Sequence, residues 1–204
     1  MEFSNGQIYH VFNRSNNSMV IFPNRDKYLF FLSKINEFIK PHAQILAWCL
    51  MPTHFHLMID VDNYQIQLKT KPMKEVYPIN RKVKYRTLND SFAIMLRSYT
   101  RTINTQFNKH GSLFQQHTKA VCLTEPKLSQ AYFQTQFGTL LNVSLSENEY
   151  PNVCFNYIHS NPVNDRLVKS PEEWEFSSYR DYFAGRKGKL VNKVLAKEIG
   201  LIDE

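Results

Sequence analysis

The sequence lacks the features that are typical of membrane proteins, secreted proteins and disulfide-rich proteins. No apolar run approaches the ~18 residues needed to cross a bilayer, and the first residues, MEFSNGQIYHVF, contain no apolar stretch typical of a signal peptide. Three cysteines, Cys49, Cys122 and Cys154, form no CxxC pair, which argues against a disulfide framework or a zinc site. We therefore expect a cytoplasmic protein with reduced thiols and no membrane-spanning segment.

Acidic residues are scarce relative to basic ones. The 204 residues include 25 Lys and Arg against 18 Asp and Glu, which gives a net charge of +7. Most of this excess lies in residues 63–88, where seven Lys and Arg accompany one acid, Glu75. Such charge favours a polyanionic partner. We interpret 63–88 as an exposed basic excursion, and a solvated loop without a partner is the alternative.

Hydrophobic periodicity predicts both strands and helices. The predicted strands are 8–14, 43–51, 54–61 and 112–123, and the predicted helices are 24–40, 89–111 and 151–161. The short connection Pro52-Thr53 favours an antiparallel hairpin. This order indicates an α+β fold, a ferredoxin-like antiparallel sheet with helices on one face, followed by a short helical C-terminal tail.

Local signals suggest the element boundaries and a division of the chain. Asn89 or Asp90 can cap the helix at 89–111, Gly111 follows it, and Pro162 is expected to end the helix at 151–161. We expect a catalytic domain over 1–165, which includes a long connection at 124–150, and a helical tail over 166–204 packed on or beside it.

The stretch MPTHFHLMID contains two histidines in an apolar strand pattern. Residues i and i+2 of a strand share a face, so His54 and His56 lie together with Met58 and Asp60, opposite the core face. Two imidazoles with an oxygen ligand suit a catalytic divalent cation. From the spacing alone, a pair of hydrogen-bonded strand histidines is the alternative.

Four motifs in order extend this pattern: MPTHFHLMI, HGSLFQQHTKA, YIHSNPV and WEFSSYRDY. Together they resemble the HUH-type single-tyrosine transposases, in the branch of REP-associated tyrosine transposases, from about Tyr9 onward. The resemblance implies that His54 and His56 bind a divalent cation, Mg²⁺ or Mn²⁺. It also implies that Tyr157 is the nucleophile, and that a polar residue near it completes the metal site. Asn161, at i+4 from Tyr157, is our third ligand, and His159 is its competitor.

The resemblance implies metal-dependent cleavage and rejoining of single-stranded or hairpin DNA through a covalent 5′-phosphotyrosine, that is, DNA transposition. The DNA-binding candidates are Arg97 and Arg101, on the polar side of the helix at 89–111, and Lys82, Lys84 and Arg86 in the excursion. A domesticated protein that binds or nicks hairpins without transposition is the nearest alternative. A nucleic-acid-binding module with structural histidines and a hydrolase using water are two others. Monomer and homodimer both stay open.

Overall fold

A four-stranded antiparallel sheet forms the centre of the protein. The computed structural model describes residues 1–68, 83–124, 132–135, 138–141 and 149–203. The sheet consists of β1 (Ile8–Arg14), β2 (Ala43–Met51), β3 (His54–Val61) and β6 (Lys119–Cys122), in the order β2-β3-β1-β6. The first three predicted strands are confirmed to the residue. The fourth is shorter than predicted, because residues before it turn around the sheet end, where the Gln115 N–H donates to the Arg14 carbonyl at 2.9 Å.

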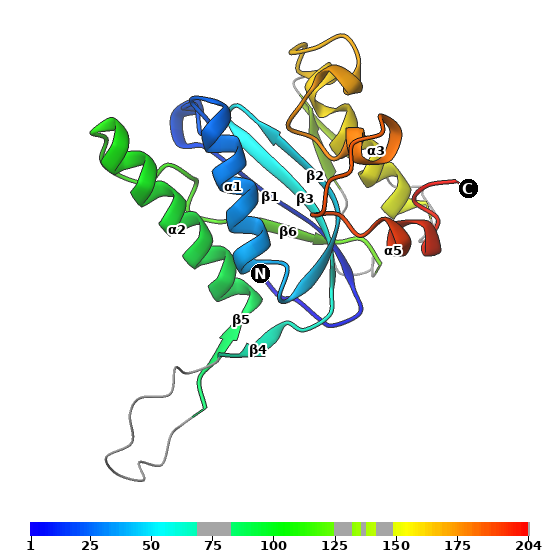
Figure 1. Ribbon diagram of the computed structural model, residues 1–204, viewed down its shortest axis with the longest axis horizontal. Coiled ribbons are helices and arrows are strands. Elements are labelled where there is room, and N and C mark those ends of the chain that lie inside the picture. The colour runs from blue at the N-terminus through cyan, green and yellow to red at the C-terminus, as the bar shows by residue number, and fades with distance from the viewer. Residues whose placement is uncertain (69–82, 125–131, 136–137, 142–148, 204) are drawn as a thin grey trace.

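Helices cover both faces of the sheet. α1 (Arg25–Phe38) and α2 (Leu88–Phe107) pack on one face, and α3 (Tyr150–Asn164) packs on the other (Figure 1). The prediction of helices on one face is therefore correct for α1 and α2 and wrong for α3. The physical reason is that the strands are apolar on both sides: Phe55 and Leu57 face the first layer, whereas Cys49 and Met58 face α3 and are equally buried.

Three of the differences between the predicted and observed helix boundaries have a clear physical reason. Thr87 rather than Asn89 or Asp90 caps α2, because it forms a reciprocal capping box with the Asp90 side chain. α2 ends at Phe107, since Asn108 adopts the left-handed conformation three residues before Gly111. α3 continues through Pro162 to Asn164, and Pro162 itself is buried. Proline this close to a helix end forfeits little, so packing outweighs its helix-breaking tendency.

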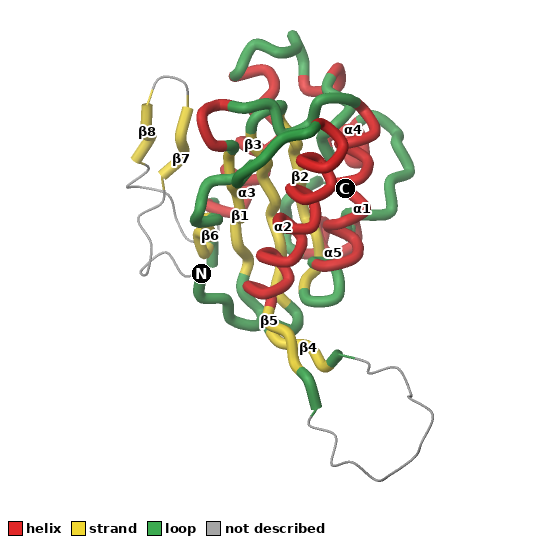
Figure 2. Tube along the Cα trace, turned by 90° about the vertical axis from the view of Figure 1, so that its left-hand side faces the viewer, coloured by secondary structure: helices red, strands yellow, loops and turns green. Residues whose placement is uncertain are grey.

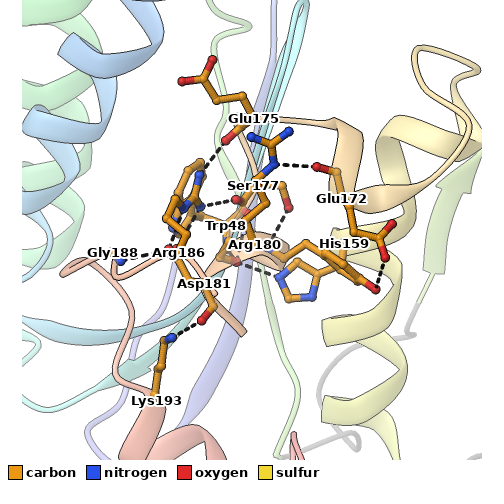
Figure 3. Close-up of polar contacts among 12 residues, drawn as sticks. Trp48, His159, Glu172, Glu175, Ser177, Arg180, Asp181, Arg186, Gly188 and Lys193 are labelled. Carbon is orange, nitrogen blue, oxygen red and sulfur yellow. Dashed lines mark hydrogen bonds and ion pairs between the residues drawn. The ribbon is translucent and has the colours of Figure 1, made fainter. Parts of the chain in front are cut away.

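The predicted helical tail runs along the outer edge of β2. It contains η3 (Pro171–Glu173), α4 (Tyr179–Phe183) and α5 (Lys193–Glu198). Its backbone bonds to β2 three times: Leu50 N–H to Phe176 O, Ser178 N–H to Trp48 O and Asn192 N–H to Ile45 O, each at 2.8 Å. The buried Asp181 carboxylate accepts two hydrogen bonds from Arg186, whose guanidinium lies 5.2 Å from the Trp48 ring (Figure 3). These contacts fix the tail to the sheet edge.

Shorter elements surround this core. η1 (Asn16–Ser18) follows β1, and β4 (Gln65–Gln67) pairs with β5 (Tyr85–Thr87) as a ribbon at the base of the basic excursion (Figure 2). β7 (Tyr132–Thr135) and β8 (Gly138–Leu141) form a separate pair within the predicted connection at 124–150. Most of the excursion, including Lys82, lies outside the described residues. Within the described part of the chain, no helix combines the length and apolar composition that crossing a membrane requires.

Candidate active site

Packing of α3 on the sheet brings together side chains that are about half the chain apart. His54 and His56 stand on the face of β3 that α3 covers, and Tyr157 lies on α3. The Tyr157 and His56 rings make an edge contact, with centroids 5.5 Å apart and planes at 86°. The predicted nucleophile and the predicted histidine pair therefore occupy one site.

The two β3 histidines lie nearly perpendicular to each other. Their ring centroids are 5.1 Å apart and their planes cross at 89°. Burial lowers the pKa of His54, and a hydrogen bond with the Asn161 side chain acts in the opposite direction. Burial, together with the neighbouring His54 and His10 rings, holds the pKa of His56 well below its ordinary value. Both rings are thus neutral near pH 7 and keep a nitrogen lone pair.

His10 is a third imidazole at the site, which the sequence reasoning did not single out. Its Nε2 lies 2.9 Å from Nδ1 of His56, and its ring makes an edge contact with Tyr157 at 5.9 Å between centroids. Burial lowers its pKa to about 3. Strand alternation puts His10 on one face with Ile8 and Phe12, and the pairing of Phe12 with His56 shows which face that is.

Tyr157 and Asn161 lie one helical turn apart on α3. The Asn161 Nδ2 donates to the Tyr157 backbone carbonyl at 3.1 Å, and its side chain lies close enough to the Tyr157 phenol and to His54 to influence the pKa of both. Burial raises the pKa of Tyr157, and the hydrogen bond from Asn161 partly offsets this increase. The phenol is therefore protonated near neutral pH.

His159, the competitor of Asn161, points away from this site. Its Nε2 forms a 2.7 Å hydrogen bond with Ser178 Oγ in the tail. Its ring, which Figure 3 draws on α3, packs against Phe155 and Tyr182. This position follows from helical geometry, since a residue at i+2 from Tyr157 projects to a different side. Of the two alternatives, the geometry leaves Asn161 beside His54.

The site offers two imidazoles and one amide as ligands. Among the described residues, no three His, Cys, Asp or Glu side chains form a cluster that could hold a metal. His56 Nε2, however, is buried and has no hydrogen-bond partner within that part of the chain. A buried polar atom of this kind needs a partner. Neutral imidazole nitrogens and an amide oxygen fit a divalent cation that keeps open coordination positions.

A groove of about 1040 Å³ lies between α2 and residues 108–118. Arg97 and Arg101, both predicted to bind DNA, are exposed and line it together with Lys109. None of the described residues that line the groove is Asp or Glu. At one end, Gln115 bonds to Arg14, which pairs across the sheet with His54. This end of the groove therefore lies next to the strand pair that carries His54.

The excursion residues are less uniform than the sequence suggested. Lys84 is exposed beside β5, whereas Arg86 is half-buried and lies 5.4 Å from the Phe38 ring centroid. Lys82 falls outside the described residues. Arg86 therefore has a packing role, and Lys84 is the more accessible cation.

The comparisons with known proteins identify a structural relative. No family model and no curated protein sequence matches the chain. A solved structure, of a REP-associated tyrosine transposase bound to a REP hairpin, superposes with a TM-score of 0.53 over 94% of this chain and 92% of that chain, at 14% sequence identity. At the level of the fold, this match confirms the resemblance that the four motifs indicated.

Proposed function

We propose that this protein is a transposase that cleaves and rejoins single-stranded or hairpin-bearing DNA through a covalent bond to Tyr157. One observation carries the proposal: packing of α3 on β3 places the Tyr157 ring 5.5 Å from that of His56, with Asn161 one helical turn from Tyr157 and beside His54. The structural relative, which is bound to a REP hairpin, supports the same reading of the substrate.

Tyr157 supplies the attacking atom in the proposed reaction. Its Oη forms a bond to a backbone phosphorus while the bond from that phosphorus to the 3′-oxygen breaks. The DNA 5′-phosphate is then esterified to tyrosine, and the phenolic proton is balanced by the proton that the released 3′-hydroxyl gains. Because burial raises the pKa of Tyr157, this proton must leave during the attack rather than before it. Attack by another 3′-hydroxyl reverses the step and rejoins strands.

His54, His56 and Asn161 would hold the divalent cation, Mg²⁺ or Mn²⁺. When bound, the cation supplies Lewis-acid stabilisation of charge on the scissile phosphate. Asn161 would have two functions, because its side chain lies near both His54 and the phenol of Tyr157. It would therefore align the nucleophile with the ligand pair.

The groove along α2 is the proposed DNA-binding surface. Arg97 and Arg101 can neutralise phosphates, while the amides of Asn104 and Gln115 can bond to exposed bases. Arg14, across the sheet from His54, is a cation at the junction between groove and site. A strand that follows the groove would reach Tyr157 around the end of β1.

We also propose how the chain is divided and which topology its catalytic part has. A β-α-β-β-α-β order with sheet order β2-β3-β1-β6 supports a ferredoxin-like catalytic unit, 1–165, and we treat 166–204 as its tail. Whether it acts as a monomer or a homodimer stays open, since both are compatible with one site per chain.

Substitution of Tyr157 by phenylalanine tests the proposal. Tyr157→Phe should bind a labelled hairpin-bearing single strand but form no covalent adduct on a denaturing gel, because the attacking oxygen is removed. Tyr64→Phe, which changes an exposed tyrosine, is the matched control and should form adduct like the wild type.

Each alternative function predicts a different result on this gel. An adduct in Tyr157→Phe would assign the nucleophile elsewhere. Cleavage by Tyr157→Phe without an adduct would indicate a hydrolase that uses water. Binding without cleavage or adduct in the wild type would indicate a DNA-binding module.

A further inference from the structure

His10 contacts the candidate site without belonging to the predicted ligand set. Its ring is 3% exposed, and its Nε2 lies 2.9 Å from Nδ1 of His56. A hydrogen bond between two neutral imidazoles needs one protonated and one unprotonated nitrogen. The direction of this bond decides which nitrogen of His56 carries the proton.

The two directions have different consequences for His56. If His10 donated the proton, that of His56 would be on Nε2, a buried atom with no hydrogen-bond partner in the described part of the chain. A buried N–H would then be unsatisfied, which costs free energy. If His56 donates from Nδ1, its Nε2 carries a lone pair instead. That lone pair is what a cation needs.

We propose that His10 is a positioning residue, which accepts the Nδ1 proton of His56 and thereby holds Nε2 in the form that binds the divalent cation. Histidine ligands commonly donate their second N–H to a group that fixes the ring, and here an imidazole takes the place of the usual carboxylate or carbonyl. This inference rests on the proposed function and deepens it.

The surroundings of His10 suit a positioning role. β1 lies between β3 and β6 in the sheet, so its backbone is held on both sides. The ring stacks on Phe12, with centroids 4.7 Å apart and planes at 29°, and makes an edge contact with Tyr157. One fixed ring therefore contacts both a proposed ligand and the proposed nucleophile.

Nuclear magnetic resonance of the metal-free wild type tests the direction of the bond without any mutation. Long-range ¹H–¹⁵N correlations distinguish the two imidazole tautomers. We expect His56 to be protonated at Nδ1 and His10 to be unprotonated at Nε2. Protonation of His56 at Nε2 would overturn the inference.

Calorimetric titration with Mn²⁺ alone tests the consequence. His10→Phe keeps the stacking but removes the acceptor, so the Mn²⁺ affinity should fall about 10- to 100-fold. His10→Gln can offer its Oε1 as acceptor and should stay close to the wild type. His42→Phe removes a buried imidazole that bonds to Ser91 on the opposite side of the sheet, and should lower stability without changing Mn²⁺ affinity.

The outcomes separate this inference from the function on which it rests. Wild-type affinity in His10→Phe would overturn the role of His10 and leave the metal site standing. Absence of Mn²⁺ binding in the wild type would contradict the metal site itself, and with it the role of His10.

Discussion

The two faces of the sheet are built from different chemistry. Beneath α1 and α2, aromatic rings such as Phe31, Phe55 and Tyr99 pack together, and among the described residues His42 is the buried histidine on that side. On the α3 side, the imidazoles of His10, His54, His56 and His159 occur among aliphatic and aromatic side chains and two thiols. Burying polar rings is costly, so stability alone does not explain the α3 face. Both faces bury apolar side chains, but only the α3 face also holds the residues of the proposed site.

Exposed positive charge and the buried imidazoles of the proposed site lie on opposite sides of the sheet. The groove along α2 carries exposed cations, whereas the α3 site holds neutral rings and the phenol of Tyr157. Affinity for DNA and cleavage of DNA are thus expected to depend on different sides of the sheet, and mutations can separate them.

The largest effect should come from the histidine pair. His54→Ala or His56→Ala should reduce cleavage about a thousandfold, because each removes a proposed ligand while leaving the apolar face of β3 intact. A chelator should have the same effect on the wild type, and Mg²⁺ or Mn²⁺ should restore the wild type only. Cleavage assays with circular dichroism as the folding control measure this. Full cleavage in chelator by metal-stripped protein would end the metal hypothesis.

Acid should weaken the protein through the imidazoles of the α3 face. His10 and His159 have folded pKa values of about 3, below the unfolded value near 6.5, so only the unfolded state binds their protons between these limits. Stability is therefore complete above about pH 6.5 and falls as pH decreases, by about tenfold in the unfolding equilibrium constant per ring and pH unit. Urea unfolding at pH 5.5 and 4.5, where the unfolded imidazoles are mostly protonated and the folded ones are not, measures the slope. His159→Gln should reduce the number of protons taken up on unfolding by about one, and an unchanged slope would count against this assignment.

The α2 groove should govern affinity more than chemistry. Arg97→Gln combined with Arg101→Gln should weaken DNA binding about tenfold and reduce the dependence of log K on log salt by about 0.7 per lost contact for a single strand. The cleavage rate at saturating DNA should change less than the affinity does. Binding across a salt series, with Lys34→Gln on α1 as a control that removes one positive charge outside the groove, provides the test. Parallel salt slopes would mean that these arginines do not meet phosphate.

The smallest effect should come from the basic excursion. Neutralising Lys82, Lys84 and Arg86 together should weaken binding to DNA of any sequence by a few-fold, with a salt-slope change of up to about 0.7 per contact. Because Arg86 packs on Phe38, Arg86→Gln alone should mainly lower the unfolding temperature. Affinity that is unchanged in the triple variant would support the solvated-loop alternative.

Sequence reasoning worked best where a short-range rule decides the structure. Strand alternation in residues 8–14 and 54–61 located β1 and β3, and the i+4 relation between Tyr157 and Asn161 correctly gave two residues one turn apart on α3. These relations depend only on backbone geometry. The roles of the site residues, including those of His54, His56 and Tyr157, stay predictions.

Sequence reasoning failed where long-range packing decides the structure. Register between β1 and β3 sets His10 beside His56, and no local pattern encodes that register. The side on which α3 packs, and its passage through Pro162, likewise depend on contacts with β2 and the tail. A histidine in the first strand, on the same face as a later histidine pair, is the signal that could have directed attention to His10.

The tail along β2 has a consequence for solubility. β2 is a nine-residue apolar strand at the end of the sheet, and its backbone groups at Ile45, Trp48 and Leu50 are taken up by residues 176–192. An uncovered apolar edge strand is a template for pairing with another chain. In this protein the C-terminal segment covers this edge, and we expect it to prevent self-association through β2. Loss of this segment would expose the outer edge of β2, which would then become a site of aggregation.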